Sequence, residues 1–205
     1  MTQKERQERS RALIIQAATE EFGTLGYDNV SVELICRKHG LSKGMMYHYY
    51  RGKDDLFLEC VGHTFVLLCQ YIEAEAPKLD GPHALENIKL FLMARELFFK
   101  DHPLEKTLFE CAVFHHPRHL AQALDEARHG IRRLNMDFIT SQLSRMKLRE
   151  GLDSRQVERY LGSIDYLFQD LLTSYRDGRK AEDIHDMLTS AGELLSMLLF
   201  GVIER

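Results

Sequence analysis

Residues 40–53, GLSKGMMYHYYRGK, place a glycine, a run rich in tyrosine and a basic end side by side. Gly40 can end one short helix, and Ser42 can accept a hydrogen bond from the first turn of the next. Ser31 can begin the preceding helix in the same way. Two short helices joined by a tight turn that contains glycine form a helix-turn-helix, whose second helix enters the major groove of DNA. The stretch therefore predicts a helix-turn-helix.

The second of these helices, 43–49, has two different faces. Successive residues turn by about 100°, so a helix that points Met46 inward also buries Tyr50 and part of Tyr49. The residues that point outward or flank this face are Lys43, Gly44, Tyr47 and His48. A glycine there lets the backbone approach a duplex, and the other three side chains can offer hydrogen bonds and apolar contact to base edges. For Tyr49, packing and DNA contact are equally good interpretations.

Charge is concentrated around this helix. The chain carries a net −4, yet residues 34–53 hold five cations and no acidic residue, so the rest of the chain carries −9. The cations are Arg37, Lys38, Lys43, Arg51 and Lys53. Such a local patch can attract and hold the phosphates of a nucleic acid on an acidic protein. A plain solvated surface explains the same charges, so the patch alone does not decide the function.

The rest of the sequence has helical spacing and no strand alternation. Helices are expected at 12–25, 54–75, 83–101, 103–114, 118–149, 153–177 and 180–204. Residues 76–82, APKLDGP, have the composition of a linker. We expect an all-α protein with a three-helix helix-turn-helix domain in 1–53 and a larger helical domain in 54–205, which helix 54–75 connects.

Residues 14–57 resemble the DNA-binding module of the tetracycline-repressor (TetR) family of regulators in helix lengths, spacing and residue types. The matching residues are Ala18, Phe22, Gly26, Tyr27, Val30, Ser31, Val32, Ile35, Cys36, the run 40–50, Lys53 and Leu56. The resemblance implies DNA contacts from Ser31, Lys43, Tyr47, His48, Tyr49 and Lys53. Met45 stands where a threonine often touches a phosphate, so that role is not carried over. His39 stands where a small residue is common.

The resemblance also implies partners for the larger domain. In the family this domain usually takes a small ligand between its helices, which implies a ligand-responsive regulator, expected to be a repressor. Such a regulator binds a palindromic double-stranded DNA operator as a homodimer. The last two helices, about 153–204, offer more apolar surface than one core needs, which favours them as the dimer interface. The sequence identifies neither the effector nor the operator.

Polar residues that interrupt apolar stripes are candidates for the effector site. Arg95 is embedded in IKLFLMARELFF, 88–99, and a buried guanidinium needs a carboxylate from the protein or from a ligand. An internal ion pair with Glu96 or Asp165 is favoured over an anionic effector. The candidate set is Arg95, Asn135, Phe138 and Tyr166. Its two aromatic members fit a plain core equally well.

Two metal hypotheses remain as alternatives. A di-iron-like enzyme rests on two E-x-x-H pairs, Glu126/His129 and Glu182/His185. It is not favoured, because both pairs lie off the apolar stripes of their helices. A soft divalent metal site rests on Cys111, His115, His116 and His119. A solvated helix end explains these histidines without a metal. With no phosphate loop or nucleophile motif, we expect no enzyme, no metal and no cofactor. A sequence-indifferent architectural DNA-binding protein is the remaining alternative.

The location of the protein is expected to be cytoplasmic. The N-terminus, MTQKERQERS, is polar and has no signal-peptide pattern. The longest apolar run, 194–203, is about half of the ~18 residues that a membrane span needs. The four cysteines show no C-x-x-C spacing, so they are expected to be reduced.

Overall fold

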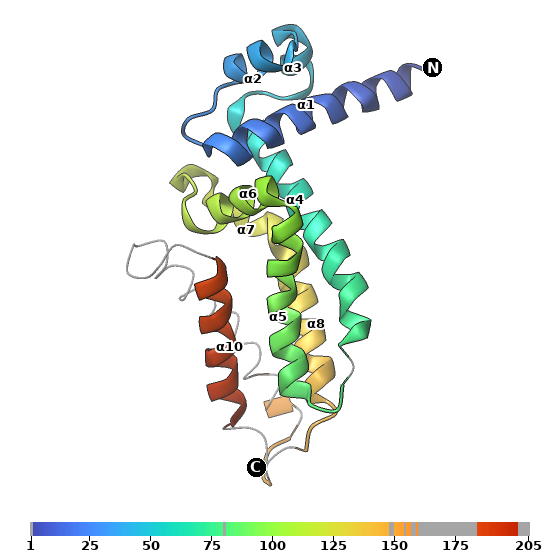
Figure 1. Ribbon diagram of the computed structural model, residues 1–205, viewed down its shortest axis with the longest axis vertical. Coiled ribbons are helices and arrows are strands. Elements are labelled where there is room, and N and C mark those ends of the chain that lie inside the picture. Colours follow the sequence, from blue (N-terminus) through green and yellow to red (C-terminus); the bar gives the residue numbers. More distant parts are fainter. Residues whose placement is uncertain are drawn as a thin grey trace. The chain divides into compact units, whose positions relative to one another are not determined.

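The computed structural model describes residues 2–79, 81–147, 150–153, 155, 156, 159 and 184–200, with side chains up to residue 197 (Figure 1). Every regular element among these residues is helical, which confirms the predicted all-α class. The described chain forms two compact units. The first contains the residues up to Val66 and Asp101–Arg128, and the second contains Leu67–Lys100 and the residues from His129 onward. The DNA-binding boundary expected at residue 53 stays a prediction, because packing units do not test which residues bind DNA.

The first unit begins with the predicted helix-turn-helix. It contains α1 (Gln3–Leu25), α2 (Val32–His39) and α3 (Lys43–Tyr49), as Figure 1 shows. The hydroxyl of Ser31 accepts a hydrogen bond from the Leu34 amide at 3.1 Å, and that of Ser42 accepts one from the Met45 amide at 3.0 Å. Gly40 adopts a left-handed conformation, with φ 64°. The two serine caps and the glycine cap are therefore confirmed.

Helix α1 is longer than its apolar spacing indicates. The expected start was residue 12, but the helix begins at Gln3. Thr2 and Glu5 form a capping box, in which each side chain accepts a hydrogen bond from the backbone amide of the other, at 3.2 and 2.9 Å. Residues 3–11 are polar and all but Ser10 are exposed, so they leave no apolar stripe from which the helix could be predicted.

The core of the first unit joins α1 to α4 (Lys53–Glu75) and α6 (Pro103–Phe114). Phe22 is buried against the Phe57 ring edge to face, with 5.2 Å between centroids. α6 packs on α1, and the approach is closest at Gly23. A Cβ atom placed on Gly23 would lie 2.7 Å from Leu104 Cβ, so this contact requires a glycine. The short helices η2 (Arg118–Leu120) and α7 (Ala121–Ala127) follow α6.

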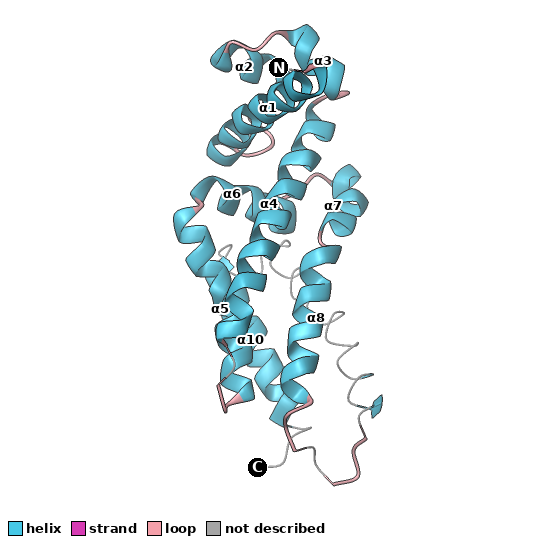
Figure 2. Ribbon diagram, turned by 90° about the vertical axis from the view of Figure 1, so that its right-hand side faces the viewer, coloured by secondary structure: helices cyan, strands magenta, loops and turns pink. Residues whose placement is uncertain are grey.

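The second unit contains the rest of α4, then η1 (Ala76–Lys78), α5 (Ala84–Asp101), α8 (His129–Leu143) and α10 (Ile184–Phe200). Figures 1 and 2 show α5, α8 and α10 running side by side. The rings of Phe91 and Phe138 stack between α5 and α8 with 3.9 Å between centroids. Nearer the start of α5, in the same interface, the Asn87 amide donates to the Gln142 side-chain oxygen at 2.9 Å. Both amides are buried, and the bond satisfies a donor and an acceptor there.

The single helix expected at 118–149 is wrong. Helix α7 instead ends at Ala127, and Arg128, with φ −80° and ψ −6°, shares its amide between the Leu124 and Asp125 carbonyls before α8 begins at His129. Gly130, a poor helix former, follows in the first turn of α8, which ends at Leu143 rather than near residue 149. The helix expected at 153–177 lies almost entirely outside the described residues.

Helix α4 is long and apolar. Among the described residues, Lys53–Lys78 is the stretch long and apolar enough to cross a membrane. Its apolar side chains are used inside the protein, however, because Leu56, Phe57, Leu68 and Ile72 are fully buried. α4 is therefore a core helix in this structure.

Candidate nucleic-acid interface and effector residues

Helix α3 presents the two faces that the sequence predicts. Met46 is 0% exposed, Tyr50 is buried, and Tyr47 is 51% exposed. Lys43, Gly44 and His48 are exposed, and Tyr49 is half-buried with its ring against His48 at 4.9 Å between centroids. The predicted orientation of the helix is confirmed. Contact between these residues and DNA stays a prediction.

Gly44 has no role in the packing of the described residues. A Cβ atom at this position would meet nothing within 4 Å. Glycine inside a helix costs roughly 0.5–1 kcal/mol relative to alanine. A glycine that the fold does not need, on the exposed face of α3, suits a place where another molecule approaches the backbone.

Two predicted DNA contacts have partners inside the first unit. The Lys43 ammonium lies 3.1 Å from the Glu33 carboxylate, and both side chains are more than half exposed. The Lys53 ammonium lies 4.0 Å from the centre of the Tyr27 ring and 3.5 Å from the Asp28 carbonyl oxygen. Exposed ion pairs contribute little to stability, so Lys43 can exchange Glu33 for a phosphate at small cost.

A Glu33→Gln variant should bind DNA more tightly, because it removes a carboxylate that competes with phosphate for Lys43. We expect a gain of about two- to fivefold for specific and random duplexes alike, the size of one exposed ion pair. Fluorescence anisotropy at several salt concentrations measures it. Glu126→Gln on α7 makes the same charge change on another helix and should have no effect. An equal gain in both variants would mean that net charge, rather than the Lys43 pair, is responsible.

The buried residue Glu21 is a feature that the sequence interpretation missed. Its carboxylate is 0% exposed and accepts hydrogen bonds from Lys38 Nζ at 2.9 Å and from His39 Nε2 at 2.9 Å. Burial raises the pKa of Glu21, but the bonds from Lys38 and His39 lower that pKa further, so it ends below its ordinary value. Lys38, expected to hold a phosphate, thus ties α2 to α1. Glu21 lies on the apolar stripe of α1 with Ala17 and Ala18, and this position is the feature of the sequence that indicates its burial.

A second polar cluster joins the start of α4 to η2 and to Tyr27, which lies in the turn after α1. The Asp54 carboxylate accepts a hydrogen bond from the Tyr27 hydroxyl and pairs with His119 Nε2 at 2.8 Å. The bond from Tyr27 is the main reason that the pKa of Asp54 is lowered. Burial, followed by the same bond, raises the pKa of Tyr27. His119, a member of the alternative metal set, is therefore engaged with Asp54.

The metal hypotheses gain no geometric support from the part of the chain that is described. There, the group whose ligand atoms gather closely is Glu20, Glu21 and His39, not the set around Cys111. The Lys38 ammonium already lies against Glu21 in that group. Burial raises the pKa of the Cys111 thiol, which disfavours the thiolate that a metal needs. Of the E-x-x-H pairs, Glu126 and His129 are exposed, whereas Glu182 lies outside the described residues.

Three of the four candidate effector residues lie together between α5 and α8. Arg95 is 3% exposed, and its guanidinium donates to the Phe91 carbonyl oxygen at 2.7 Å and to the side-chain oxygen of Asn135. The Phe138 ring stacks on the Phe91 ring. The Arg95 guanidinium lies over the Phe91 ring, 5.1 Å from its centroid. Tyr166 lies outside the described residues.

The expected ion pair between Arg95 and Glu96 is wrong. The Glu96 carboxylate contacts His185 Nδ1 of α10 instead. Consecutive residues on a helix point about 100° apart, so Glu96 cannot follow Arg95 into the interior. Asp165, the other expected partner, is outside the described residues.

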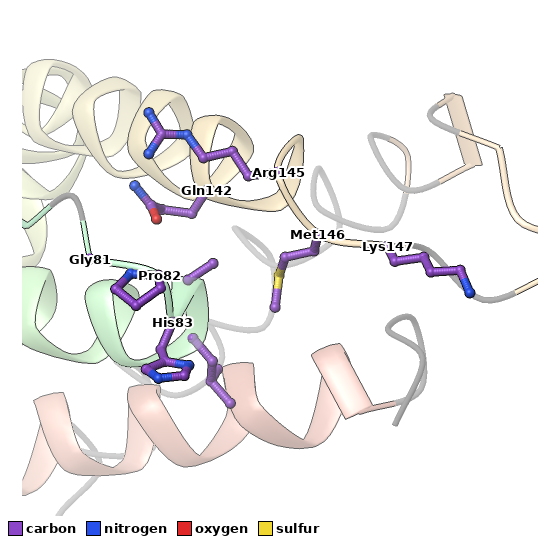
Figure 3. A pocket seen from close by; sticks show the side chains of 9 residues that line it. Gly81, Pro82, His83, Gln142, Arg145, Met146 and Lys147 are labelled. Carbon is purple, nitrogen blue, oxygen red and sulfur yellow. The ribbon is translucent and has the colours of Figure 1, made fainter.

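A pocket of about 520 Å³ lies elsewhere in the second unit, between the start of α5 and the end of α8 (Figure 3). Its lining residues are Gly81, Pro82, His83, Ala84, Leu85, Gln142, Arg145, Met146 and Lys147. Arg95, Asn135 and Phe138 do not line it. Figure 3 shows Lys147 pointing away from His83 and Gln142, so the basic groups do not converge on one point.

Comparison with known proteins identifies what this arrangement resembles. Residues 14–60 match the family of bacterial regulatory proteins called the tetR family. The HTH-type transcriptional regulator YdgC of Bacillus subtilis is 23% identical over 202 residues, covering 96% of this chain and 94% of the relative. The fatty acid metabolism regulator protein of B. subtilis is 24% identical over 192 residues, covering 92% and 93%. The crystal structure of B. subtilis FadR in complex with stearoyl-CoA has the same fold, with a TM-score of 0.57 at 23% identity, covering 90% and 97%.

Proposed function

Because this chain belongs to the tetR family of bacterial regulatory proteins and is a DNA-binding helix-turn-helix regulator of transcription, we propose that it is a ligand-responsive repressor. It binds a palindromic operator as a homodimer and is released by a small-molecule effector. The DNA-binding domain is 1–53, and 54–205 binds the effector and forms the dimer through about 153–204. Its location is the cytoplasm, and it is not an enzyme.

One observation carries the DNA-binding part of this proposal. Helix α3 exposes Gly44, Tyr47 and His48 on one face, and nothing in the described packing requires a glycine at position 44. An exposed tyrosine beside a glycine offers base-edge contacts to a helix that lies in the major groove. Ser31, Lys43, Tyr49 and Lys53 complete the proposed interface around that face, with the two lysines on phosphates.

Variants of α3 and α4 separate the two kinds of contact. Tyr47→Ala or His48→Ala should relax sequence preference, at roughly 1–3 kcal/mol for each lost base contact. Lys53→Ala should weaken binding to specific and random duplexes alike and flatten the salt dependence by about one unit of slope. Binding titrations over a range of salt measure both. Equal losses for all three variants on every duplex would contradict the assignment of α3 as the reading helix, and leave a sequence-indifferent binder.

The response to an effector is proposed to work by a shift in population. The effector binds more tightly to a conformer in which the two reading helices are wrongly spaced than to the conformer that binds DNA. The affinity for DNA falls by at most the ratio of the effector's affinities for these two conformers. The group formed by buried Arg95 and half-buried Asn135 and Phe138 supports an effector site between α5 and α8. Tyr166 is proposed as a further member from the sequence. The stearoyl-CoA bound to FadR supports ligand binding in a protein of this fold.

A further inference from the structure

The buried guanidinium of Arg95 has only neutral partners among the described residues. Its Nη1 donates to the carbonyl oxygens of Phe91, at 2.7 Å, and Leu92, at 3.2 Å. Its Nη2 donates to the side-chain oxygen of Asn135. These groups satisfy hydrogen bonds but supply no negative charge. The described acidic neighbour in sequence, Glu96, is occupied by His185.

A charge in this position is costly to the fold. Desolvation of an arginine without an anionic partner is unfavourable, and an apolar side chain of similar volume is often at least as stable there. Burial lowers the pKa of Arg95 to about 10, so the group is still a cation at neutral pH. Among the described residues, the hydrogen bonds of Arg95 are therefore made without an opposite charge to offset its desolvation.

The surroundings of Arg95 restrict what the missing anion can be. No second Lys or Arg contacts the guanidinium among the described residues, so a single negative charge is matched and a polyphosphate is not. The Phe91 ring lies beside the guanidinium and stacks on the Phe138 ring, and the two rings provide an apolar surface. A carboxylate accepts two parallel hydrogen bonds from a guanidinium, and its apolar body can lie against rings.

We propose that Arg95 anchors the carboxylate of an effector that is a monocarboxylic acid with an apolar body. This rests on the proposed ligand-responsive function and specifies the chemical class of the ligand. Binding supplies a negative charge that the described partners of Arg95 do not supply, so the effector gains a charge-assisted pair inside the helical unit. A thioester such as an acyl-CoA has no carboxylate at the acyl end and would not make this pair.

The first test needs no ligand and measures thermal unfolding of the full chain. Arg95→Met should raise the melting temperature, and Arg95→Gln, which keeps hydrogen-bond donors without the charge, should not lower it. Asp165→Asn should leave the melting temperature unchanged. If the Arg95 variants and Asp165→Asn are all destabilised and their effects do not add, then Arg95 belongs to an internal ion pair and the proposal is wrong.

The second test measures binding of defined probes by calorimetry. Octanoate, dodecanoate and phenylacetate are each paired with their methyl esters. At least one acid should bind the wild type with its ester binding about tenfold or more weakly, the size of a lost charge-assisted hydrogen bond. Arg95→Gln should abolish that preference and keep DNA binding. If none of the three acids binds more tightly than its methyl ester, the proposal is wrong. DNA binding is measured on the same samples. A protein that does not bind DNA contradicts the proposed function, and this result is distinct from a failure to prefer the acids.

Discussion

Replacing Lys38 with methionine and His39 with leucine is expected to lower the free energy of unfolding by about 3 kcal/mol at neutral pH. Both substitutions remove hydrogen bonds to Glu21, whose side chain is 0% exposed. Losing the partner of a buried charge costs roughly 3–5 kcal/mol. The lower end applies because Lys38 itself is 53% exposed. Urea denaturation of the double variant and the wild type measures the difference.

Glu21→Met added to the same double variant is the matched control. It replaces the unpaired carboxylate with an apolar side chain of similar volume, so most of the lost stability should return. A triple variant no more stable than the double variant would show that the buried carboxylate is not the cause.

The pH dependence gives the sign of the Glu21 contribution. The folded-state pKa of Glu21 lies below its ordinary value, so in the wild type its stabilisation is present above the unfolded pKa and is lost as pH falls through the folded pKa. In the double variant, burial without partners raises the pKa of Glu21, and protonation relieves the penalty. The gap between the two proteins should therefore begin to shrink as pH falls through the raised pKa of Glu21 in the double variant, and continue to shrink as pH falls through its lowered pKa in the wild type.

Gly23→Leu is the other substitution with a large expected effect, about 3 kcal/mol of unfolding free energy. A Cβ atom at Gly23 would lie 2.7 Å from Leu104 Cβ, 2.8 Å from its Cα and 2.9 Å from its carbonyl oxygen. Two of these atoms are backbone and cannot turn aside, so α6 must move off α1. Denaturant unfolding measures the loss, and Gly23→Ala should show a smaller one.

Gly62→Ala is the control for the Gly23 series. Gly62 also lies inside a helix of the first unit, but a Cβ atom there meets nothing within 4 Å. Alanine should therefore stabilise the helix by roughly 0.5–1 kcal/mol. If Gly23→Leu is as stable as the wild type, the close approach of α1 and α6 is not as described.

The helix-turn-helix could be predicted from the sequence because its determinants are local. Serine caps and a left-handed glycine depend on residues within one turn, and they placed α3 at Lys43–Tyr49 as observed. The inner and outer faces of α3 followed from helical geometry alone, as the burial of Met46 and the exposure of Tyr47 show. Local patterns are sufficient where a short helix is fixed by its caps.

Contacts between distant residues could not be predicted in this way. Glu21 contacts Lys38 and His39 across 17 and 18 residues, and its place on the apolar stripe of α1 indicates its burial but not these partners. The partner of Arg95 is 40 residues away on α8. The break at Arg128 could not be predicted either, because the apolar spacing continues on both sides of it and only the sharing of the Arg128 amide between the Leu124 and Asp125 carbonyls marks it.

The central claim, that this protein reads a symmetric DNA operator, is tested most directly by selecting DNA from a random duplex pool with the purified full chain and sequencing what it retains. The account predicts one enriched sequence with two-fold symmetry, whose half-sites lie about one helical turn apart, ~34–36 Å, and whose enrichment is lost in Tyr47→Ala. Retention of DNA without any enriched sequence, or enrichment of one that lacks two-fold symmetry, would contradict it.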